Sequence, residues 1–496
     1  MPLIRTLAPL LSIALLVPAV AQDVKPAAAT LSAETIAQMR RIQSAALESD
    51  YAFEQVAHLC DNIGARLSGS PQYAKAAEYV AEQLRRDGLE VRLEKVMVPH
   101  WVRGLEAAEL VAFPGMAEGT TQRLAVTALG GSVATPAEGL TADVVAVGDF
   151  DELAALGRAG VAGRIVVFEE KFDRRLAASG FGLDAYGNAA EYRHAGASAA
   201  ARLGAVAALV RSAGGAEFRL PHTGGLDYEP NAPRIPAGAL AAEDADLIAR
   251  LARQGQVRLR LVLTPKQLPD VEAVNVVADL RGSRHPEQIV IVSGHLDSWD
   301  LGTGAIDDAA GVGVAMAVAH LVTELGLRPS RTIRVVAWAN EENGVRGGIG
   351  YAAVHRDAVA NHVGAIESDL GVDHPVGAFY DATPEAAALL QPVAKVLSSQ
   401  GAPLLRPADE TGTDLIPLST LGVPTFAPIQ DSRTYFDYHH TAADTLDKIR
   451  PQEFRENVAV GAVLAFALAD MDGRLSGVVK PMPAWLKAEI DRAALK

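Results

Sequence analysis

The sequence predicts a mixed α/β fold in which a largely parallel sheet is flanked by helices and interrupted by a second, β-rich unit. Four runs in the C-terminal half are nearly continuous in apolar residues, as buried strands are, and helical stretches separate them. These runs are residues 289–295, 332–342, 362–369 and 422–430. The chain is long enough for two or three domains with substantial cores, because 49% of its 496 residues are hydrophobic.

The first 21 residues have the composition of a secretory signal peptide. Arg5 precedes an apolar stretch at about residues 7–17, and Ala19-Val20-Ala21 matches a small-residue cleavage site. That stretch is too short to cross a bilayer as a helix. We therefore expect cleavage after Ala21, a secreted or periplasmic protein, and no membrane partner.

Changes of composition along the mature chain indicate an insertion in the main domain. Residues 22–98 carry two helical patterns and a strand, and residues 264–496 carry the α/β pattern, so together they are expected to form the main domain. Residues 99–263 instead alternate short β-type runs with Gly-rich turns and Ala-rich helical stretches. This insertion contains no cluster of metal-capable residues, and we interpret His194 and His222 as isolated surface or capping residues.

Charge and cysteine content exclude several classes of function. The formal net charge of −15 argues against nucleic acid and anionic membrane surfaces as partners, and it provides carboxylates that can hold cations. Cys60 is the only cysteine, so no intrachain disulfide can form. Its position in VAHLCDNIG favours a small buried residue over a nucleophile.

Metal-capable side chains follow each of the four apolar runs. In chain order these are His295 and Asp297, then Glu341 and Glu342, then Glu367 and Asp369, and finally His439, His440 and Asp444. Open α/β sheets bind ligands outside the carboxyl ends of their strands, because the connecting loops converge there. We therefore expect these residues to meet in one site.

The residue types favour two divalent metal ions in that site. Two histidines and three carboxylates, one of them bridging, would give each ion one imidazole and one terminal carboxylate. A bridging hydroxide would neutralise the one remaining positive charge, and two metals about 3.5–4 Å apart lower the pKa of such a water towards neutrality. Imidazole combined with carboxylate oxygen favours zinc, although manganese and cobalt fit similar sites.

The adjacent glutamates Glu341 and Glu342 are expected to differ in role. Neighbouring side chains on an extended segment point in opposite directions, so the two are not expected to bind the same ion. One can bind a metal while the other faces the water and acts as general base.

Four motifs resemble those of the co-catalytic dizinc exopeptidases of the bacterial aminopeptidase and glutamate carboxypeptidase type. They are SGHLDSWDLGTGAIDDAAG, WANEENGVRGG, ESDLG and YHHTAADT, in the family's order over about residues 290–450, and LCDNIGARLSGSP resembles the family's N-terminal segment. The resemblance implies the zinc exopeptidase fold, with residues 99–263 as an inserted protease-associated domain. It also implies a cis peptide bond between Asp307 and Asp308.

The resemblance assigns metal binding to five residues and proton transfer to a sixth. Carried over by position, one Zn²⁺ would be held by His295 and Asp369 and the other by Glu342 and His440, with Asp307 bridging both ions and Glu341 as general base. Asp297 is expected to orient the imidazole of His295, and Asp444 to give similar support.

Two neighbours of these residues are alternative ligands. Asp308 competes with Asp307 for the bridging position, and the family pattern favours Asp307. His439 competes with His440, and the match through the following T-A-A-D-T favours His440, so His439 is expected to contact substrate. Glu367 is expected to be structural.

The resemblance implies a secreted zinc metallopeptidase that hydrolyses dipeptides or short peptides from a terminus, and it also implies a homodimer. The bridging hydroxide, relieved of its proton by Glu341, would attack the scissile carbonyl, and Glu341 would then protonate the leaving amine. The alternatives are a single-zinc glutaminyl cyclase of the same fold and a non-catalytic, receptor-like relative; the complete set of five ligands counts against both. The sequence leaves open which terminus is selected, and no cluster of arginines marks a carboxylate pocket.

Overall fold

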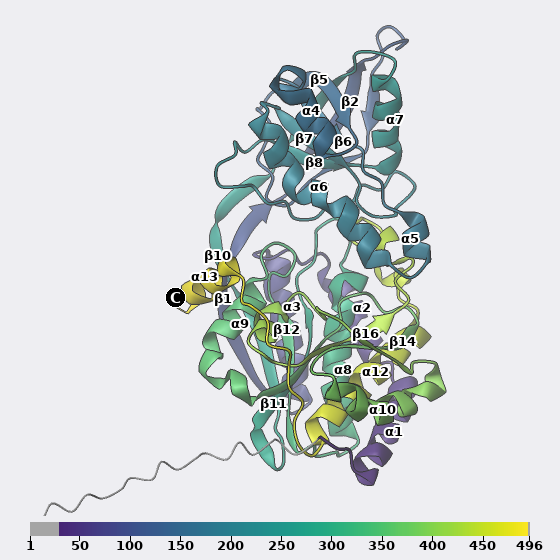
Figure 1. The fold of residues 1–496 in the computed structure, drawn as a ribbon, viewed down its shortest axis with the longest axis vertical. Coiled ribbons are helices and arrows are strands. Elements are labelled where there is room, and N and C mark those ends of the chain that lie inside the picture. Colours follow the sequence, from purple (N-terminus) through teal and green to yellow (C-terminus); the bar gives the residue numbers. More distant parts are fainter. Residues whose placement is uncertain (1–28, 495–496) are drawn as a thin grey trace, which may run out of the picture.

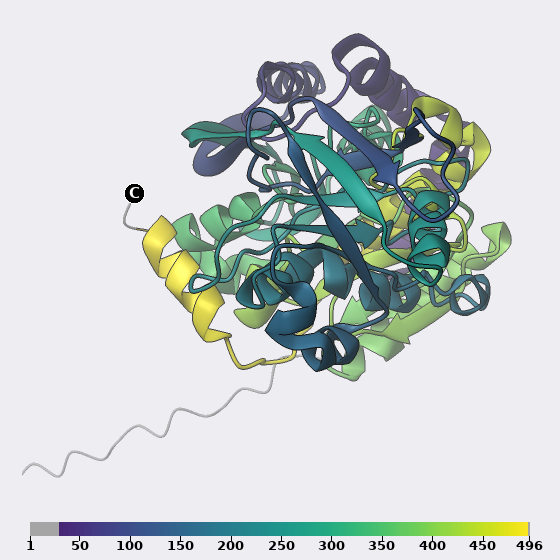
Figure 2. The same ribbon diagram turned by 90° about the horizontal axis from the view of Figure 1, so that it is seen from above.

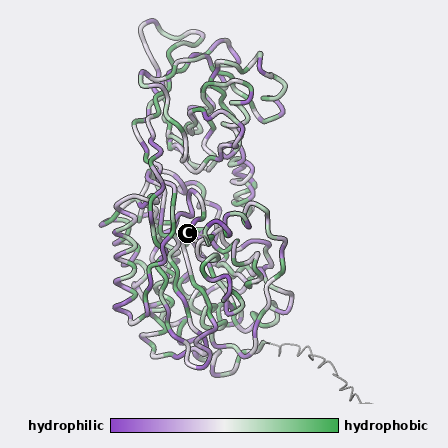
Figure 3. Tube along the Cα trace, turned by 90° about the vertical axis from the view of Figure 1, so that its left-hand side faces the viewer, coloured by the Kyte–Doolittle hydropathy of each residue, from purple (hydrophilic) through white to green (hydrophobic). Residues whose placement is uncertain are grey.

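A computed structural model describes residues 29–494 as two α/β units, one above the other in Figure 1. Each unit is built on one eight-stranded sheet. We call residues 29–102 and 266–494 the lower unit and residues 103–265 the upper unit. From above, the upper unit covers the middle of the lower unit (Figure 2), and the side view separates the same two lobes (Figure 3). The predicted signal peptide, residues 1–21, lies outside the described residues.

The lower sheet has the strand order β1-β10-β12-β11-β13-β16-β14-β15. Its central strands β12, β11, β13 and β16 run parallel, whereas β1 pairs antiparallel with β10, β10 with β12, and β14 with β16. The four predicted apolar runs form these central strands, which confirms the mixed sheet. The strands are β1 (Glu90–Val102), β10 (Lys266–Leu280), β11 (His285–His295), β12 (Arg331–Trp338), β13 (His362–Glu367), β14 (Pro375–Asp381), β15 (Leu404–Pro407) and β16 (Thr425–Gln430).

Helices cover both faces of the lower sheet. Side chains alternate between the two faces along each strand, and both faces are apolar. Val290 and Val292 of β11 pack with α1, α2, α3, α8, α10 and α12, and Ile289 and Ile291 pack on the opposite face with α9, α11 and α13. These helices are α1 (Ala33–Glu48), α2 (Tyr51–Ala57), α3 (Pro71–Arg86), α8 (Ala310–Glu324), α9 (Arg346–Val354), α10 (Glu385–Leu397), α11 (Ile416–Thr420), α12 (Pro451–Asp470) and α13 (Ala484–Ala493).

Helix α8 lies in the core of the lower unit, where it contacts α12 and β11. Its small residues allow this close packing: a Cβ added at Gly313 would lie 2.7 Å from a methyl carbon of Val56 and 3.1 Å from the ring of Phe454. Residues 305–324 are long and apolar enough to span a membrane, but 94% of the apolar window is buried inside the protein. We therefore interpret this segment as a core helix.

The upper sheet has the strand order β3-β2-β9-β5-β6-β7-β8-β4, and β5, β6, β7 and β8 run parallel. The insertion therefore combines a parallel α/β half with antiparallel strands at its edges. Its strands are β2 (Glu106–Ala112), β3 (Gln122–Leu124), β4 (Val126–Ala128), β5 (Leu140–Val147), β6 (Ile165–Phe168), β7 (Ala207–Arg211), β8 (Ala237–Leu240) and β9 (Arg258–Leu263). Its helices are α4 (Phe150–Val161), α5 (Arg174–Ala178), α6 (Gly182–Arg202) and α7 (Ala242–Ala252).

Two long strands join the units. β1 and β10 pair antiparallel over most of their length, so the chain enters and leaves the upper unit side by side. The upper unit also contacts the loop after β16. There the N–H of Gly215 donates to the carbonyl oxygen of Phe436, and the N–H of Thr223 donates to that of His440, each at 2.9 Å. These contacts hold the upper unit over the carboxyl ends of the parallel strands.

Candidate metal centre

The five predicted ligands come together at the carboxyl ends of the parallel strands. They are His295 at the end of β11, Asp307 in the turn before α8, Glu342 after β12, Asp369 after β13 and His440 in the loop after β16. Four of the residues are at most 9% exposed, and the side chain of Asp369 is 17% exposed. The sheet thus brings predicted ligands from distant parts of the chain together in one buried site.

Asp307 lies between the two histidines. Its Oδ1 is 3.1 Å from Nε2 of His295, and its Oδ2 is 3.2 Å from Nε2 of His440. Although burial opposes ionisation, the neighbouring histidines hold the pKa of Asp307 well below its usual range. The peptide bond between Asp307 and Asp308 is cis, as the resemblance implies. Each oxygen of this carboxylate faces a different imidazole.

Each histidine also faces a second carboxylate. Oδ1 of Asp369 is 3.4 Å from Nε2 of His295, and Oε2 of Glu342 is 2.9 Å from Nε2 of His440. Burial raises the pKa of Glu342 well above its usual range, and the charge of Asp307 adds to the shift. The contacts therefore divide the five side chains into two groups that share Asp307. Buried carboxylates crowded in this way need compensating cations to remain ionised.

Glu341 lines the same cavity as Asp307, Glu342 and Asp369. Its backbone N–H donates to Oδ1 of Asp297 at 3.0 Å, which fixes the turn after β12. Burial, reinforced by the carboxylates of Asp369 and Asp307, raises the pKa of Glu341 to about 8. A carboxyl group whose pKa lies near neutrality can both accept and return a proton.

The imidazole of His295 is oriented by a main-chain carbonyl, and not by the carboxylate that the sequence led us to expect. Its Nδ1 donates to the carbonyl oxygen of Asp297 at 2.9 Å, whereas Oδ1 of that residue is 3.9 Å away. The carboxylate of Asp297 accepts from the Ser68 hydroxyl at 2.9 Å and from the Glu341 N–H. Because Nδ1 carries the proton, Nε2 of His295 is free to bind a metal.

Asp444 and Arg66 hold the loop that presents Asp307. Oδ1 of Asp444 accepts from the N–H groups of Ala305 and Ile306, at 2.9 and 2.8 Å. The fully buried guanidinium of Arg66 donates to main-chain carbonyls of Gly64, Leu296, Thr303 and Gly304. Sequence reasoning missed Arg66 as a positioning residue, although it lies in the recognised segment LCDNIGARLSGSP.

The alternative carboxylates are engaged by the main chain. Oδ2 of Asp308 accepts from the N–H of His295 at 3.0 Å, and its Oδ1 accepts from the N–H of Gly311 at 2.9 Å. Oε2 of the fully buried Glu367 accepts from the N–H of Leu415 at 3.3 Å. Asp308 lies close enough to His295 to bind a metal with it, but its hydrogen bonds instead tie β11 to the start of α8.

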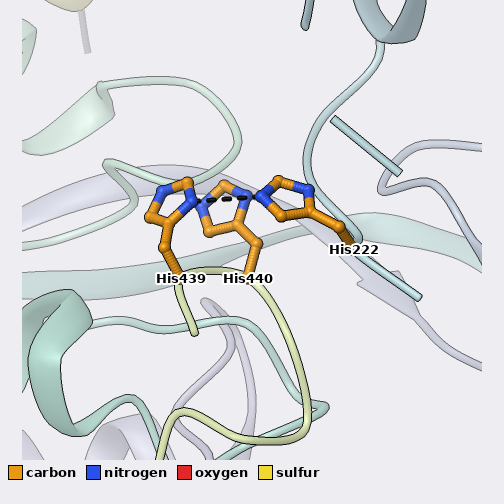
Figure 4. Close-up of side chains that lie close together, drawn as sticks. All are labelled: His222, His439 and His440. Carbon is orange, nitrogen blue, oxygen red and sulfur yellow. Dashed lines mark hydrogen bonds between the residues drawn. The ribbon is translucent and has the colours of Figure 1, made fainter. Parts of the chain in front are cut away.

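The interpretation of His222 as an isolated surface or capping residue is wrong. His222 is fully buried in the upper unit between β7 and β8, and its Nε2 lies 3.2 Å from Nδ1 of His439 (Figure 4). The rings of His439 and His440 stack with their centroids 3.6 Å apart, and Nε2 of His439 is 3.4 Å from Oδ2 of Asp307. Burial and the adjacent imidazoles lower the pKa of His222 well below its usual range, so it is neutral. Nothing in the local sequence signals this contact, because its partners lie 217 residues apart.

A cavity of about 1200 Å³ opens between the two units at this cluster. The lower unit contributes Tyr435, Phe436 and four of the five predicted ligands, all except His295, and the upper unit contributes Tyr186 and Arg193. The cavity is large enough for a short peptide, because ligand pockets typically measure about 300–1000 Å³.

Comparison of the sequence with known proteins points to one family. Residues 275–465 match the model of peptidase family M28. The chain is 37% identical to human carboxypeptidase Q over 427 residues, which cover 86% of each protein, and 38% identical to the Xenopus laevis carboxypeptidase Q over 426 residues, which cover 86% and 87%.

Solved structures agree with the sequence relatives. A peptidase M28 precursor from Shewanella amazonensis SB2B superposes with a TM-score of 0.83 at 36% identity, covering 91% of this chain and 99% of the other. An aminopeptidase from Aneurinibacillus sp. strain AM-1 has a TM-score of 0.61 at 21% identity, covering 90% and 98%, and shares the fold.

Proposed function

Because the chain belongs to peptidase family M28, we propose that it is a dizinc exopeptidase that hydrolyses dipeptides or short peptides from one terminus. The observation that carries the proposal is the position of Asp307, whose two oxygens face two histidines that each have a carboxylate of their own. A site for one metal would not need this duplication.

The donor set fits zinc. Neutral imidazole nitrogen and carboxylate oxygen are ligands that zinc prefers, and the proton on Nδ1 of His295 leaves its Nε2 available. His295 and Asp369 would hold one ion, Glu342 and His440 the other, and Asp307 would bridge them. When bound, zinc supplies Lewis acidity and lowers the pKa of water at the site.

Glu341 is the proposed general base. Its side chain lines the cavity beside Asp307, Glu342 and Asp369, so its carboxylate can take a proton from the attacking water and pass that proton to the leaving amine. Asp297 fixes the backbone of Glu341, and Asp444 fixes the turn that carries Asp307. Both act as positioning residues.

The remaining features extend the proposal to the whole protein. Residues 99–263 would act as a protease-associated domain that roofs the cavity, on the main domain of residues 22–98 and 264–496. The composition of residues 1–21 supports export to the periplasm or the medium, with removal of the signal peptide after Ala21. Peptides are the proposed partners, and a homodimer is the proposed assembly.

A dipeptide screen tests the function directly. Purified protein loaded with zinc is assayed against unblocked dipeptides and against their N-acetylated and C-amidated versions. We expect hydrolysis of unblocked dipeptides that stops on chelation and returns with zinc or cobalt. A correctly folded, zinc-loaded protein that cleaves none of these peptides would refute the proposal and favour the receptor-like alternative.

A further inference from the structure

Trp299 belongs to the lower unit by sequence, but its side chain is packed inside the upper unit. It lies in the loop between the predicted ligands His295 and Asp307, and it is 4% exposed. Its indole joins the apolar cluster built by β2, β5, β6, β7 and β9. A Cβ added at Gly130 of that unit would lie 1.9 Å from a ring carbon of Trp299. Nε1 of Trp299 has no hydrogen-bond partner among residues 29–494, so packing holds the ring in place.

Trp299 contacts both residues of one of the two proposed zinc sites. We call His295 and Asp369 the first site, and Glu342 and His440 the second site. The backbone N–H of Trp299 donates to Oε1 of Glu342 at 3.1 Å, while Oε2 of that carboxylate faces Nε2 of His440. The indole also meets the imidazole of His440 edge-on, with ring centroids 5.9 Å apart and planes at 68°. Trp299 therefore connects the second site to the apolar cluster of the upper unit.

The next residue, Asp300, is bound by an arginine of the upper unit. Nε and one Nη of Arg103 lie 2.8 and 2.7 Å from Oδ1 of Asp300. The other Nη donates to Oε1 of Glu106 and to the carbonyl oxygen of Ala128, each at 2.8 Å, and both acceptors belong to the upper unit. The upper unit thus holds two consecutive residues of the loop, Trp299 by packing and Asp300 by an ion pair.

The two proposed zinc sites differ in where their support comes from. In the first site, the hydrogen bonds that fix the backbone and the ring of His295 lie within the lower unit. In the second site, the upper unit also contacts the main chain of both residues. The N–H of Thr223 donates to the carbonyl of His440 at 2.9 Å, and a Cβ at Gly225 would lie 3.4 Å from the carbonyl oxygen of Glu342. A displacement of the upper unit would therefore disturb the second site more than the first.

We propose that Trp299 is a positioning residue through which the upper unit sets the zinc affinity of the second site. Its N–H orients the carboxylate of Glu342, and its ring, anchored in the upper unit, fixes where that N–H lies. Residues that orient metal ligands in this way typically contribute about 10- to 100-fold to metal affinity. The inference rests on the proposed dizinc function and assigns the inserted unit a part in building the metal centre.

The test is a zinc titration under chelator buffering on the unmodified protein and on Trp299→Ala. The unmodified protein should bind two zinc ions. Trp299→Ala should bind one of them with unchanged affinity and the other about 10- to 100-fold more weakly. Leu259→Ala is the matched control, since it opens a cavity in the same apolar cluster from the inner strand β9. This control should keep both affinities, which separates the role of Trp299 from a general loss of packing.

A double variant identifies the zinc site that is affected. Glu342→Gln weakens the second site, so the ion that it still binds tightly belongs to the first site. Adding Trp299→Ala to Glu342→Gln should leave the affinity for that ion unchanged. Two milder variants keep the test decisive if Trp299→Ala does not fold. Trp299→Phe retains an aromatic ring and Asp300→Asn removes only the charge that pairs with Arg103, and each should weaken the second ion alone.

The outcomes separate this inference from the proposed function. Two unchanged zinc affinities in the folded Trp299 variants would overturn the role of Trp299 while leaving a dizinc protein, as would an equal loss at both sites. A single zinc equivalent in the unmodified protein would refute the dizinc proposal, and this inference with it, before any variant is compared. Because zinc binding is measured without a substrate, a protein that cleaves no peptide would refute the proposed peptidase activity, and the titration would still decide the role of Trp299.

Discussion

At the scale of single residues, the centre depends on side chains that are neighbours in sequence and opposed in role. Both glutamates line the cavity, but Glu342 faces His440, whereas Glu341 donates its backbone N–H to Asp297. Asp307 faces two imidazoles, whereas both oxygens of Asp308 accept main-chain hydrogen bonds. The same conservative substitution is therefore expected to have different effects at the two members of each pair.

Glu341→Gln should keep both zinc ions and lose about 10²- to 10⁴-fold in kcat, because an amide can neither take a proton from water nor return it to the amine. The measurement is steady-state kinetics on an unblocked dipeptide, with metal content determined on the same sample. Near-normal turnover would rule out Glu341 as the base.

Glu342→Gln is the matched variant, and it is expected to have the opposite effect on metal content. An amide is a neutral and weaker ligand than a carboxylate, so zinc affinity should fall and excess zinc should partly restore activity. Titration with zinc under chelator buffering measures this. If Glu342→Gln stays fully loaded while Glu341→Gln loses an ion, the two assignments must be exchanged.

At the scale of elements, the loop between β7 and β8 connects the upper unit to the loop after β16. We expect His222→Ala to lower kcat/KM by roughly 2- to 10-fold, because one buried hydrogen bond to His439 is lost. His285→Ala is the control, since His285 is an exposed histidine at the start of β11. Kinetics and metal content of the two variants test the role of the loop. Unchanged kinetics in a folded His222→Ala would show that the contact has no catalytic role.

Strand β13 begins with a buried histidine that makes stability depend on pH. Nε2 of His362 lies 2.8 Å from the hydroxyl of Tyr351, to which Arg334 also donates. Burial, with Arg334 nearby, lowers the pKa of His362 to about 4. The unfolded chain, with an ordinary histidine pKa of about 6.5, binds the proton more readily, so the free energy of unfolding should fall as pH drops from about 6.5 to 4.

Urea unfolding of the metal-free protein at pH 6.5 and 4.5 measures this loss. The loss should be smaller by about 2 kcal/mol in His362→Gln, which cannot titrate in this range. Equal losses in the two proteins would contradict the assignment of a neutral His362.

At the scale of the whole molecule, the sequence predicts those features of the fold and the site that depend on local sequence patterns. Apolar runs identify the central strands, and polar residues at their ends identify the candidate ligands, because the carboxyl ends of parallel strands meet at one edge. The parallel half of the upper sheet was missed, since short β-type runs do not reveal their pairing partners.

Contacts between the two units have no local signal. His222 meets His439 and His440 only when the upper unit is placed over the lower sheet, and it looks like an isolated residue in the sequence. The sequence also does not predict that a main-chain carbonyl orients His295, because residue types do not determine the direction of the backbone after a strand. The expected carboxylate of Asp297 was near the correct atom but was not the acceptor.

The number of zinc ions bound by the active protein tests the central claim most directly. Elemental mass spectrometry of purified, active protein should give about two zinc ions per chain, because the five proposed ligands would give each of two ions one histidine and one carboxylate, with Asp307 shared. Chelation should abolish activity, and zinc or cobalt should restore it. A reproducible single equivalent of zinc in fully active protein would contradict the dizinc account and favour the single-zinc cyclase.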